Sequence, residues 1–168
     1  FMLSQKSKNV VAVDLADKMI EKAKVLHPNK NIEYICGNIC DMKFENNSLD
    51  IIITIATAHH LPYKWLLCFA KEKLKIGGKL IILDIAKAKS LYDYIIWGSA
   101  FIPNIVMNII KNGRLQKNDA HAKEVWERHI KHDTFMTIDE IKLIAEKHIP
   151  TAKISRKLFW RYILIWQK

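Results

Sequence analysis

The chain has 168 residues, of which 50% are hydrophobic and 26% are charged, and its 27 basic and 17 acidic residues leave a net charge of +10. This composition excludes a disordered chain, and the low counts of 5 glycines and 4 prolines exclude a collagen-like or low-complexity protein. A chain of this length buries about 70% of its unfolded surface, so one domain with its own core is expected, and the positive charge favours acidic partners.

In the first half, short apolar runs alternate with amphipathic segments. Apolar runs predict strands at residues 9–14, 31–36, 49–55 and 79–84. Helical spacing of apolar residues predicts helices at residues 17–26 and 64–74, the second ended by Gly77 and Gly78. Near-continuously apolar strands separated by helices are typical of a parallel sheet covered on both faces, so we predict an α/β fold.

The second half has a different character. Residues 91–110 are strongly apolar, and residues 118–131 are polar and fit a helix. Thr137 and Glu140 form a capping-box pattern that predicts a helix running to about Lys147. Residues 152–157 and 158–167 are expected to form a terminal antiparallel β-hairpin. No repeat or linker divides the chain, so we predict a single domain over residues 1–168.

The cysteine content indicates a reducing compartment. Cys36, Cys40 and Cys68 are an odd and sparse set, which fits buried free thiols in the cytoplasm better than a disulfide framework. A zinc site would have to recruit histidines from elsewhere, so no metal site is predicted here.

Ligands bind beyond the carboxyl ends of the strands in an open parallel sheet. The residues at those ends are Asp14, Asn38, the segment 54–60 and Asp84. A carboxylate at Asp14 is suited to a ribose diol, although such an acid taken alone is more often a turn or capping residue. Asn38 carries a donor and an acceptor that could read an adenine edge.

The order of motifs resembles that of class I S-adenosylmethionine-dependent methyltransferases that act on small molecules. The resemblance covers residues 1–86 and rests on five motifs in order: VAVDLADKM at 11–19, YICGNICDMKF at 34–44, NSLDIIIT at 47–54, HHLP at 59–62 and LKIGGKL at 74–80. It implies a Rossmann-like, mostly parallel sheet with flanking helices, and the segment 157–166 resembles the final hairpin strand of some members.

The resemblance implies a set of cofactor-binding residues for S-adenosylmethionine. Asp14 matches the acid that binds both ribose hydroxyls, and Asn38 stands where the family usually has an Asp at the adenine amino group. The remaining matches are Leu15 and Met19 beside the adenosine, Ile39 on the adenine ring, and Thr54 and Ile55 beside the methionine part. His59 and His60 match a histidine pair at the mouth of the site.

One departure from the family is its absent glycine-rich loop. Residues 1–8 resemble the second half of the helix that follows this loop, so we expect the chain to begin after the first strand and to bind the cofactor weakly or not at all. We still expect residues 9–14 and 50–55 to be neighbouring strands of one sheet. The division expected within the domain is a cofactor-binding half at 1–86, a helical lid insertion at 87–135, and a C-terminal helix and hairpin at 136–168.

Three other segments admit more than one interpretation. Residues 91–110 approach the length of a membrane span, but their polar interruptions favour a greasy lid with weak membrane-surface contact, or a buried helix pair. His129, His132 and Asp133 could hold a metal or supply a base, although a solvated polar cluster is the commoner meaning. Basic and aromatic residues after Glu140 could suggest nucleic-acid binding, but solvated lysines over a core strand explain them better.

The predicted function is methyl transfer from S-adenosylmethionine to a small-molecule acceptor, an apolar one if the greasy segment covers it. If the acceptor must lose a proton, the candidate bases are His60, His59 and His129, in that order. The main alternative is an inactive or fragmentary domain of the same fold with a binding role. A dehydrogenase that uses the same ribose-binding acid is disfavoured by the Gly-Asn turn and the HHLP placement.

Overall fold

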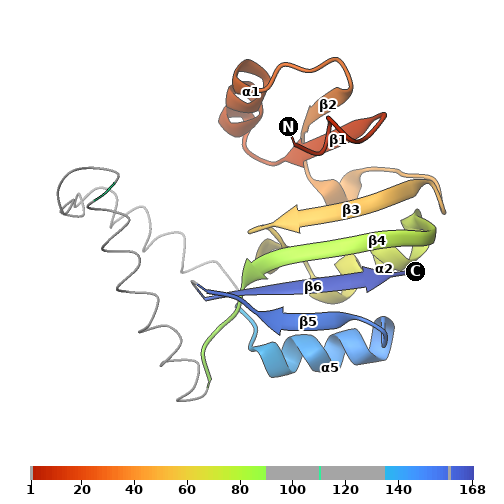
Figure 1. Cartoon of the computed structure of the whole chain (residues 1–168), viewed down its shortest axis with the longest axis vertical. Coiled ribbons are helices and arrows are strands. Elements are labelled where there is room, and N and C mark those ends of the chain that lie inside the picture. The colour runs from red at the N-terminus through yellow and green to blue at the C-terminus, as the bar shows by residue number, and fades with distance from the viewer. Residues whose placement is uncertain (1, 90–109, 111–134, 159) are drawn as a thin grey trace. The chain divides into compact units, whose positions relative to one another are not determined.

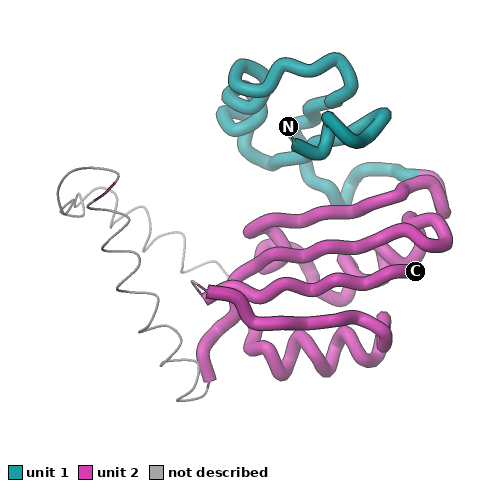
Figure 2. The backbone as a smooth tube through the Cα atoms, in the orientation of Figure 1, with its two compact units in different colours: residues 1–44 teal, residues 45–168 magenta. Residues whose placement is uncertain are grey.

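The computed structural model describes residues 2–89, 110, 135–158 and 160–168, and it divides the chain into two compact units. Unit 1 is Phe1–Phe44 and unit 2 is Glu45–Lys168 (Figure 2). Each unit is described by itself below.

Unit 1 is a two-stranded parallel sheet whose strands are connected by one helix (Figure 1). Its elements are β1 (Val10–Asp14), α1 (Asp17–Leu26), β2 (Ile32–Cys36) and the 3-10 turn η1 (Ile39–Asp41). Helix α1 has an acid in its first turn and Lys24 in its last, which suits the helix dipole, and it ends just before Pro28. These elements confirm the predicted strand–helix–strand unit to within a residue at each boundary.

The expected helix over residues 1–8 is wrong, because residues 2–6 form turns. The reason is that the side-chain amides of two asparagines form hydrogen bonds to this segment. Asn31 Nδ2 donates to the carbonyl oxygens of Ser4 and Ser7 at 2.7 and 2.9 Å, and Asn29 Nδ2 donates to the Ser4 hydroxyl at 2.9 Å. Lys6 N bonds to Leu3 O at 3.0 Å, the tighter spacing of a turn.

Unit 2 is built on a four-stranded mixed sheet with the order β3-β4-β6-β5. Its strands are β3 (Leu49–Ile55), β4 (Leu74–Ile85), β5 (Lys153–Arg156) and β6 (Arg161–Gln167). Strands β3 and β4 are parallel, whereas β6 is antiparallel to both β4 and β5, which confirms the terminal hairpin. The remaining elements are η2 (Ala58–His60), α2 (Tyr63–Lys73) and α5 (Ile138–His148).

The prediction that Gly77 and Gly78 end a helix is wrong, because both residues lie inside β4. Helix α2 ends at Lys73, and β4 begins at once with Leu74. The pairing with β3 shifts register between Leu49 and Ile51, and Gly77 adopts a φ of +81° beside this irregularity. A left-handed backbone at that point favours glycine. The glycines therefore allow the irregular pairing of β3 with β4 and do not cap a helix.

The core of unit 2 lies on one face of its sheet, under α2 and α5. Leu80 and Ile82 of β4 and Leu164 of β6 are fully buried there, and Leu67 of α2 is also fully buried. On the alternate residues of the strands, Ile51, Ile55 and Ile165 are 49%, 61% and 40% exposed. Because successive side chains of a strand point to opposite faces of the sheet, one face is buried under the helices and the other exposes apolar side chains.

Strands β1 and β3 are not neighbours in one sheet, so that expectation is corrected. Strand β1 pairs with β2, and β3 pairs with β4; between the fully described strands β1 and β3 no ladder forms. The α/β class, the parallel pairs, the flanking helices and the C-terminal hairpin are confirmed.

Several predicted features lie outside the described residues: the greasy segment 91–109, the polar segment 118–131, and His129 with His132. The described residues on either side of these segments are held together. Lys87 N donates to Met136 O at 2.8 Å, and Lys87 forms an isolated parallel β-bridge with Thr137. Among the helices that the structure describes, none is long and apolar enough to cross a membrane.

Candidate functional site

In unit 1, the residues predicted to hold the nucleoside lie at the carboxyl ends of β1 and β2. Asp14 pairs with Cys36 at the ends of the two parallel strands, and Gly37 N donates to Asp14 O at 2.9 Å. The exposed Asp14 carboxylate accepts from Ala16 N through Oδ1 at 2.8 Å. The strand pairing thus brings Asp14 and the Gly37–Asn38 turn to one edge of the sheet, as predicted from sequence.

The Asn38 side chain has a local structural role. Its Oδ1 accepts from Cys40 N at 3.0 Å and caps the 3-10 turn η1. An amide oxygen has a second lone pair, and Nδ2 is a donor, so the side chain keeps capacity for a ligand edge. Around this edge, Leu15 and Met19 are 69% and 56% exposed, whereas Ile39 is half-buried.

In unit 2, a buried carboxylate–imidazole pair lies at the carboxyl end of β4. Asp84 is 1% exposed, and its Oδ1 lies 2.6 Å from His59 Nδ1. The same carboxylate accepts from the backbone amides of His59 at 2.8 Å and of Ile85 at 2.7 Å. Three N–H groups therefore converge on one carboxylate when His59 carries its proton on Nδ1, which satisfies a buried charge that would otherwise be costly.

Two buried tyrosines lie close enough to Asp84 for its charge to act on them. The hydroxyl of Tyr162, on β6, donates to that of Tyr63, on α2, at 3.2 Å. Burial raises the pKa of Tyr63 to about 12, the hydrogen bond from Tyr162 opposes this rise, and the charge of Asp84 adds to it. Burial also raises the pKa of Tyr162. Both phenols therefore stay neutral near neutral pH and bring no second charge to Asp84.

The end of β3 contributes a buried polar atom and a strained residue. The Thr54 hydroxyl is buried and has no hydrogen-bond partner among the described residues, while Ile55 is exposed. Ala56, the next residue, has a φ of +51° and donates its N–H to Leu83 O at 2.8 Å. Non-glycine residues in this left-handed region cluster at functional sites, and the strain turns the chain from β3 into η2.

The second histidine of the pair is placed differently from the first. The rings of His59 and His60 are 4.0 Å apart, but His60 is exposed, whereas the His59 side chain is 8% exposed. His59 also stacks on Phe135, with ring centroids 5.0 Å apart. The structure therefore joins His59 to the buried acid and leaves His60 at the surface, and His129 lies outside the described residues.

The cysteines are free, as predicted, but they are not buried as a set. Cys36 is exposed, and Cys40 and Cys68 are intermediate. Cys36 lies at the carboxyl end of β2, and its Sγ contacts Leu15 O at 3.6 Å. Within the described ranges, no group of three or more His, Cys, Asp or Glu side chains could hold a metal ion.

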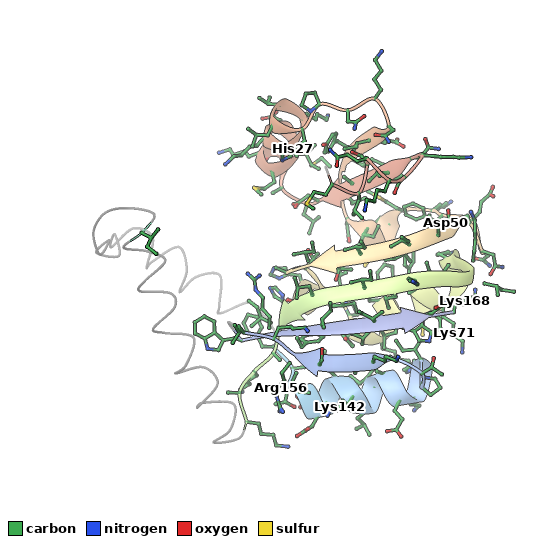
Figure 3. All side chains as sticks on the ribbon, in the orientation of Figure 1. His27, Asp50, Lys71, Lys142, Arg156 and Lys168 are labelled. Atoms are coloured by element: carbon green, nitrogen blue, oxygen red, sulfur yellow. The ribbon has the colours of Figure 1, made fainter. Side chains whose placement is uncertain are left out.

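The basic side chains of unit 2 come from separate elements. Figure 3 labels Lys71 on α2, Lys142 on α5, Arg156 on β5 and Lys168 at the chain end. Lys168 is tied down, because its Nζ donates to Asn47 Oδ1 and to Leu74 O at 2.8 Å. This distribution agrees with solvated lysines on several faces.

Sequence reasoning missed the role of Asp84. The residue was recognised as a strand end, but nothing in its spacing joined it to His59, which lies 25 residues earlier. The parallel pairing of β3 and β4 makes the connection, because Ile55, the last residue of β3, is paired with Leu83, so η2 after β3 and Asp84 after Leu83 come to the same end of the sheet. Tyr63 and Tyr162, 99 residues apart, gave no signal as a pair.

Comparison with known proteins finds similarity to methyltransferases. A family model described as a methyltransferase domain matches residues 1–82. No curated protein sequence matches the chain.

Solved structures share the fold at low sequence identity. Protein PH0226 of Pyrococcus horikoshii OT3 is 18% identical, with a TM-score of 0.60 over 99% of this chain and 74% of that one. An S-adenosylmethionine-dependent methyltransferase from Mesorhizobium loti is 11% identical, with a TM-score of 0.61 over 99% of this chain and 84% of that one. One from Aquifex aeolicus is 17% identical, with a TM-score of 0.54 over 94% and 68%.

Proposed function

Because the chain carries a class I S-adenosylmethionine-dependent methyltransferase domain, we propose that it transfers the methyl group of that cofactor to a small-molecule acceptor. The observation that carries the proposal is the placement of Asp14 and Asn38 at adjoining carboxyl strand ends in unit 1, inside the segment that matches the family model.

The residues of this chain fit the cofactor by their chemistry. Asp14 keeps an exposed carboxylate with lone pairs beyond the one used by Ala16 N, which suits two ribose hydroxyls. The unpartnered buried hydroxyl of Thr54 is a polar atom suited to a bound polar group. When bound, the cofactor supplies an electrophilic methyl group on a positively charged sulfur.

We assign the parts of the cofactor to the residues predicted from sequence. Asp14 holds the ribose, and Asn38 with Ile39 receives the adenine. The apolar side chains of Leu15 and Met19 flank the adenosine, and Thr54 with Ile55 lies beside the methionine part. This chain would contribute chiefly by bringing the acceptor into line with the methyl group, since proximity and orientation can supply most of the rate enhancement.

The acceptor and the compartment belong to the proposal as well. A small apolar acceptor fits the greasy segment 91–110, which would also give weak contact with a membrane surface, and no nucleic-acid partner is proposed. Free cysteines fit a reducing cytoplasm. His60, His59 and His129 are the proposed bases for an acceptor that must lose a proton.

Isothermal titration with S-adenosylhomocysteine tests the cofactor assignment. Any binding that the whole chain shows should weaken about a hundredfold or more in Asp14→Ala, because two hydrogen bonds to a charged group contribute about 1.5–3 kcal/mol each. Asp17→Ala, an exposed acid in the first turn of α1, is the matched control and should bind like the wild type.

Two results would contradict the proposal in different ways. Equal binding by wild type and Asp14→Ala would show that Asp14 does not hold the ribose. Absence of binding by the wild-type chain would favour a non-catalytic domain that keeps the fold without turnover.

A further inference from the structure

We propose that a basic cavity in unit 2 binds a small organic phosphate, a ligand in which a phosphomonoester group is joined to an apolar part. The cavity has a volume of about 480 Å³, which lies within the range of pockets that hold small molecules. Its lining residues are Lys79, Thr151, Lys153, Ile165, Gln167 and Lys168. All six belong to unit 2 and none is assigned to the cofactor, so the inference goes beyond methyl transfer and does not depend on it.

Strand pairing brings the lining residues to one end of the sheet. Strand β6 lies between β4 and β5, with Lys79 of β4 opposite Gln167 and Lys153 of β5 opposite Ile165. The starts of β4 and β5 and the end of β6 therefore meet at the same edge, which is marked by the label of Lys168 in Figure 3 (compare Figure 1). This edge is opposite to the carboxyl ends of the parallel strands β3 and β4, where ligands of such sheets ordinarily bind.

The four strand residues of the cavity share the exposed face of the sheet. Leu80 and Trp166, which adjoin them along the chain, are buried in the core on the other face, and successive side chains alternate between faces. Lys79 and Lys153 lie on either side of β6, roughly 10 Å apart across the sheet and roughly 7 Å apart along it. Two long lysine side chains at that spacing can both reach a group bound over Ile165.

The polar side chains of the cavity offer hydrogen-bond donors. Lysine ammonium groups only donate, and the amide nitrogen of Gln167 adds two N–H donors. The Thr151 hydroxyl oxygen accepts from Trp166 Nε1 at 3.1 Å, which leaves its own hydrogen for a ligand. No lining residue carries a carboxylate. This set suits a ligand group rich in acceptor oxygens, and a phosphomonoester presents three.

The positive charges of the cavity are not neutralised by neighbouring acids. None of the ion pairs formed among the described residues includes Lys79, Lys153 or Lys168. Lys168 Nζ donates instead to two neutral oxygens, Asn47 Oδ1 and Leu74 O, at 2.8 Å each. Three lysines therefore face a ligand whose phosphate carries about −1.5 to −2 charges near neutral pH.

The apolar residue of the cavity favours an organic phosphate over inorganic phosphate. Ile165 is 40% exposed and lies opposite Lys153 in the strand register, so an apolar surface adjoins the basic groups. Burying this surface against an apolar part of the ligand adds to the affinity that the charges provide.

A nucleic acid fits these observations less well. Binding along a nucleic-acid backbone needs a basic path that extends beyond one cavity, together with aromatic side chains on which bases stack. The lining contains no aromatic residue, and Lys71, Lys142 and Arg156 lie on other elements (Figure 3).

An NMR titration of the whole chain with phenyl phosphate tests the ligand class, with inorganic phosphate and phenol as reference probes. Phenyl phosphate should bind with a Kd below about 1 mM and more tightly than either reference probe, because it alone carries both groups. Changes in amide chemical shift should concentrate at residues 151–153 and 165–168. Absence of binding, equal binding of phenol, or shifts confined to other residues would overturn the proposal.

Charge-removing variants test the lysines. Lys79→Gln and Lys153→Gln should each weaken phenyl phosphate binding about tenfold, because each removes a charge-assisted hydrogen bond, whereas Lys153→Arg should bind nearly as the wild type does. Lys142→Gln, on α5 and outside the cavity, is the matched control and should change nothing. All of these side chains are exposed, so the fold should be retained. Equal binding by the wild type and both glutamine variants would overturn the assignment.

Two further measurements separate the parts of the ligand and exclude a nucleic acid. Ile165→Thr should reduce the preference for phenyl phosphate over inorganic phosphate and leave the binding of inorganic phosphate unchanged. A short single-stranded RNA should compete weakly with phenyl phosphate. Tight RNA binding that phenyl phosphate does not displace, and that Lys142→Gln weakens as much as Lys79→Gln does, would overturn the proposal in favour of a nucleic-acid surface.

Discussion

Gly78 allows the backbones of β3 and β4 to approach closely. A Cβ at this position would lie 2.9 Å from Lys75 O, 3.1 Å from Asp50 O and 3.2 Å from Leu49 O. All three are backbone oxygens, which cannot move without disturbing the strands. We expect Gly78→Ala to lower the free energy of unfolding by about 1–3 kcal/mol, as overpacking commonly does, measured by urea denaturation.

Gly37→Ala is the matched control for this substitution. Its Cβ would meet only the flexible end of Met42, at 3.2 Å from Cε, so the neighbour can adjust and the change in stability should be smaller. Equal stability of the Gly78→Ala variant and the wild type would contradict the close approach.

At the scale of single residues, the sequence revealed roles that depend on neighbours along the chain and missed those that depend on folding. Asp14 follows directly on an apolar run, so its position at a strand end was readable. The partnership of Asp84 with His59 depends on strand pairing, and the buried Thr54 hydroxyl depends on which face of β3 is covered. Neither condition has a local sequence signal.

Among the elements, α5 offers the sharpest test because both halves of its capping box are formed. Thr137 Oγ1 accepts from Glu140 N at 3.3 Å, and Glu140 Oε2 accepts from Thr137 N at 2.7 Å. Thr137→Ala should therefore lower the free energy of unfolding by about 1 kcal/mol near neutral pH, measured by urea denaturation. Glu146→Ala, on the same helix but outside the box, should change stability less.

The capping box should also make this stability depend on pH. The bonds from the Thr137 backbone and then its side chain lower the pKa of Glu140 below its ordinary value of 4.5. The folded state then binds fewer protons than the unfolded one, so the contribution is present above the unfolded pKa and is lost as pH falls through the folded pKa. The penalty of Thr137→Ala should shrink over that acid range, and an undiminished penalty there would contradict the linkage.

Element boundaries were predictable where a local signal ends the element. The capping box at Thr137 and Pro28 after α1 are such signals, and both helices match their predicted ranges closely. The α2–β4 boundary was misjudged because a Gly-Gly pair usually marks a helix end, whereas here the glycines serve the register shift against β3. The turns at residues 2–6 were missed because their partners, Asn29 and Asn31, lie about one helix away in sequence.

For the whole molecule, the distribution of buried apolar residues predicts unequal local stability in the two units. Among the described residues, Ile20 at 5% exposure is the one buried hydrophobic residue of unit 1, whereas the core cluster lies entirely in unit 2. A two-stranded sheet with little buried surface is marginal alone. We expect amide hydrogens of β1 and β2 to exchange at least about tenfold faster than those of β4 and β6, because local opening there exposes less apolar area.

Two core substitutions test this expectation from opposite sides. Leu67→Ala removes a fully buried side chain of α2 and should reduce the protection of β4 and β6 by about 2–5 kcal/mol of opening free energy. Ile20→Ala should reduce the protection of β1 and β2 while leaving β4 and β6 close to the wild type, because the unit 2 core contains no part of α1. If Ile20→Ala lowered protection in all four strands equally, the two units would share one cooperative transition, and the stability of the domain could not be assigned to separate cores.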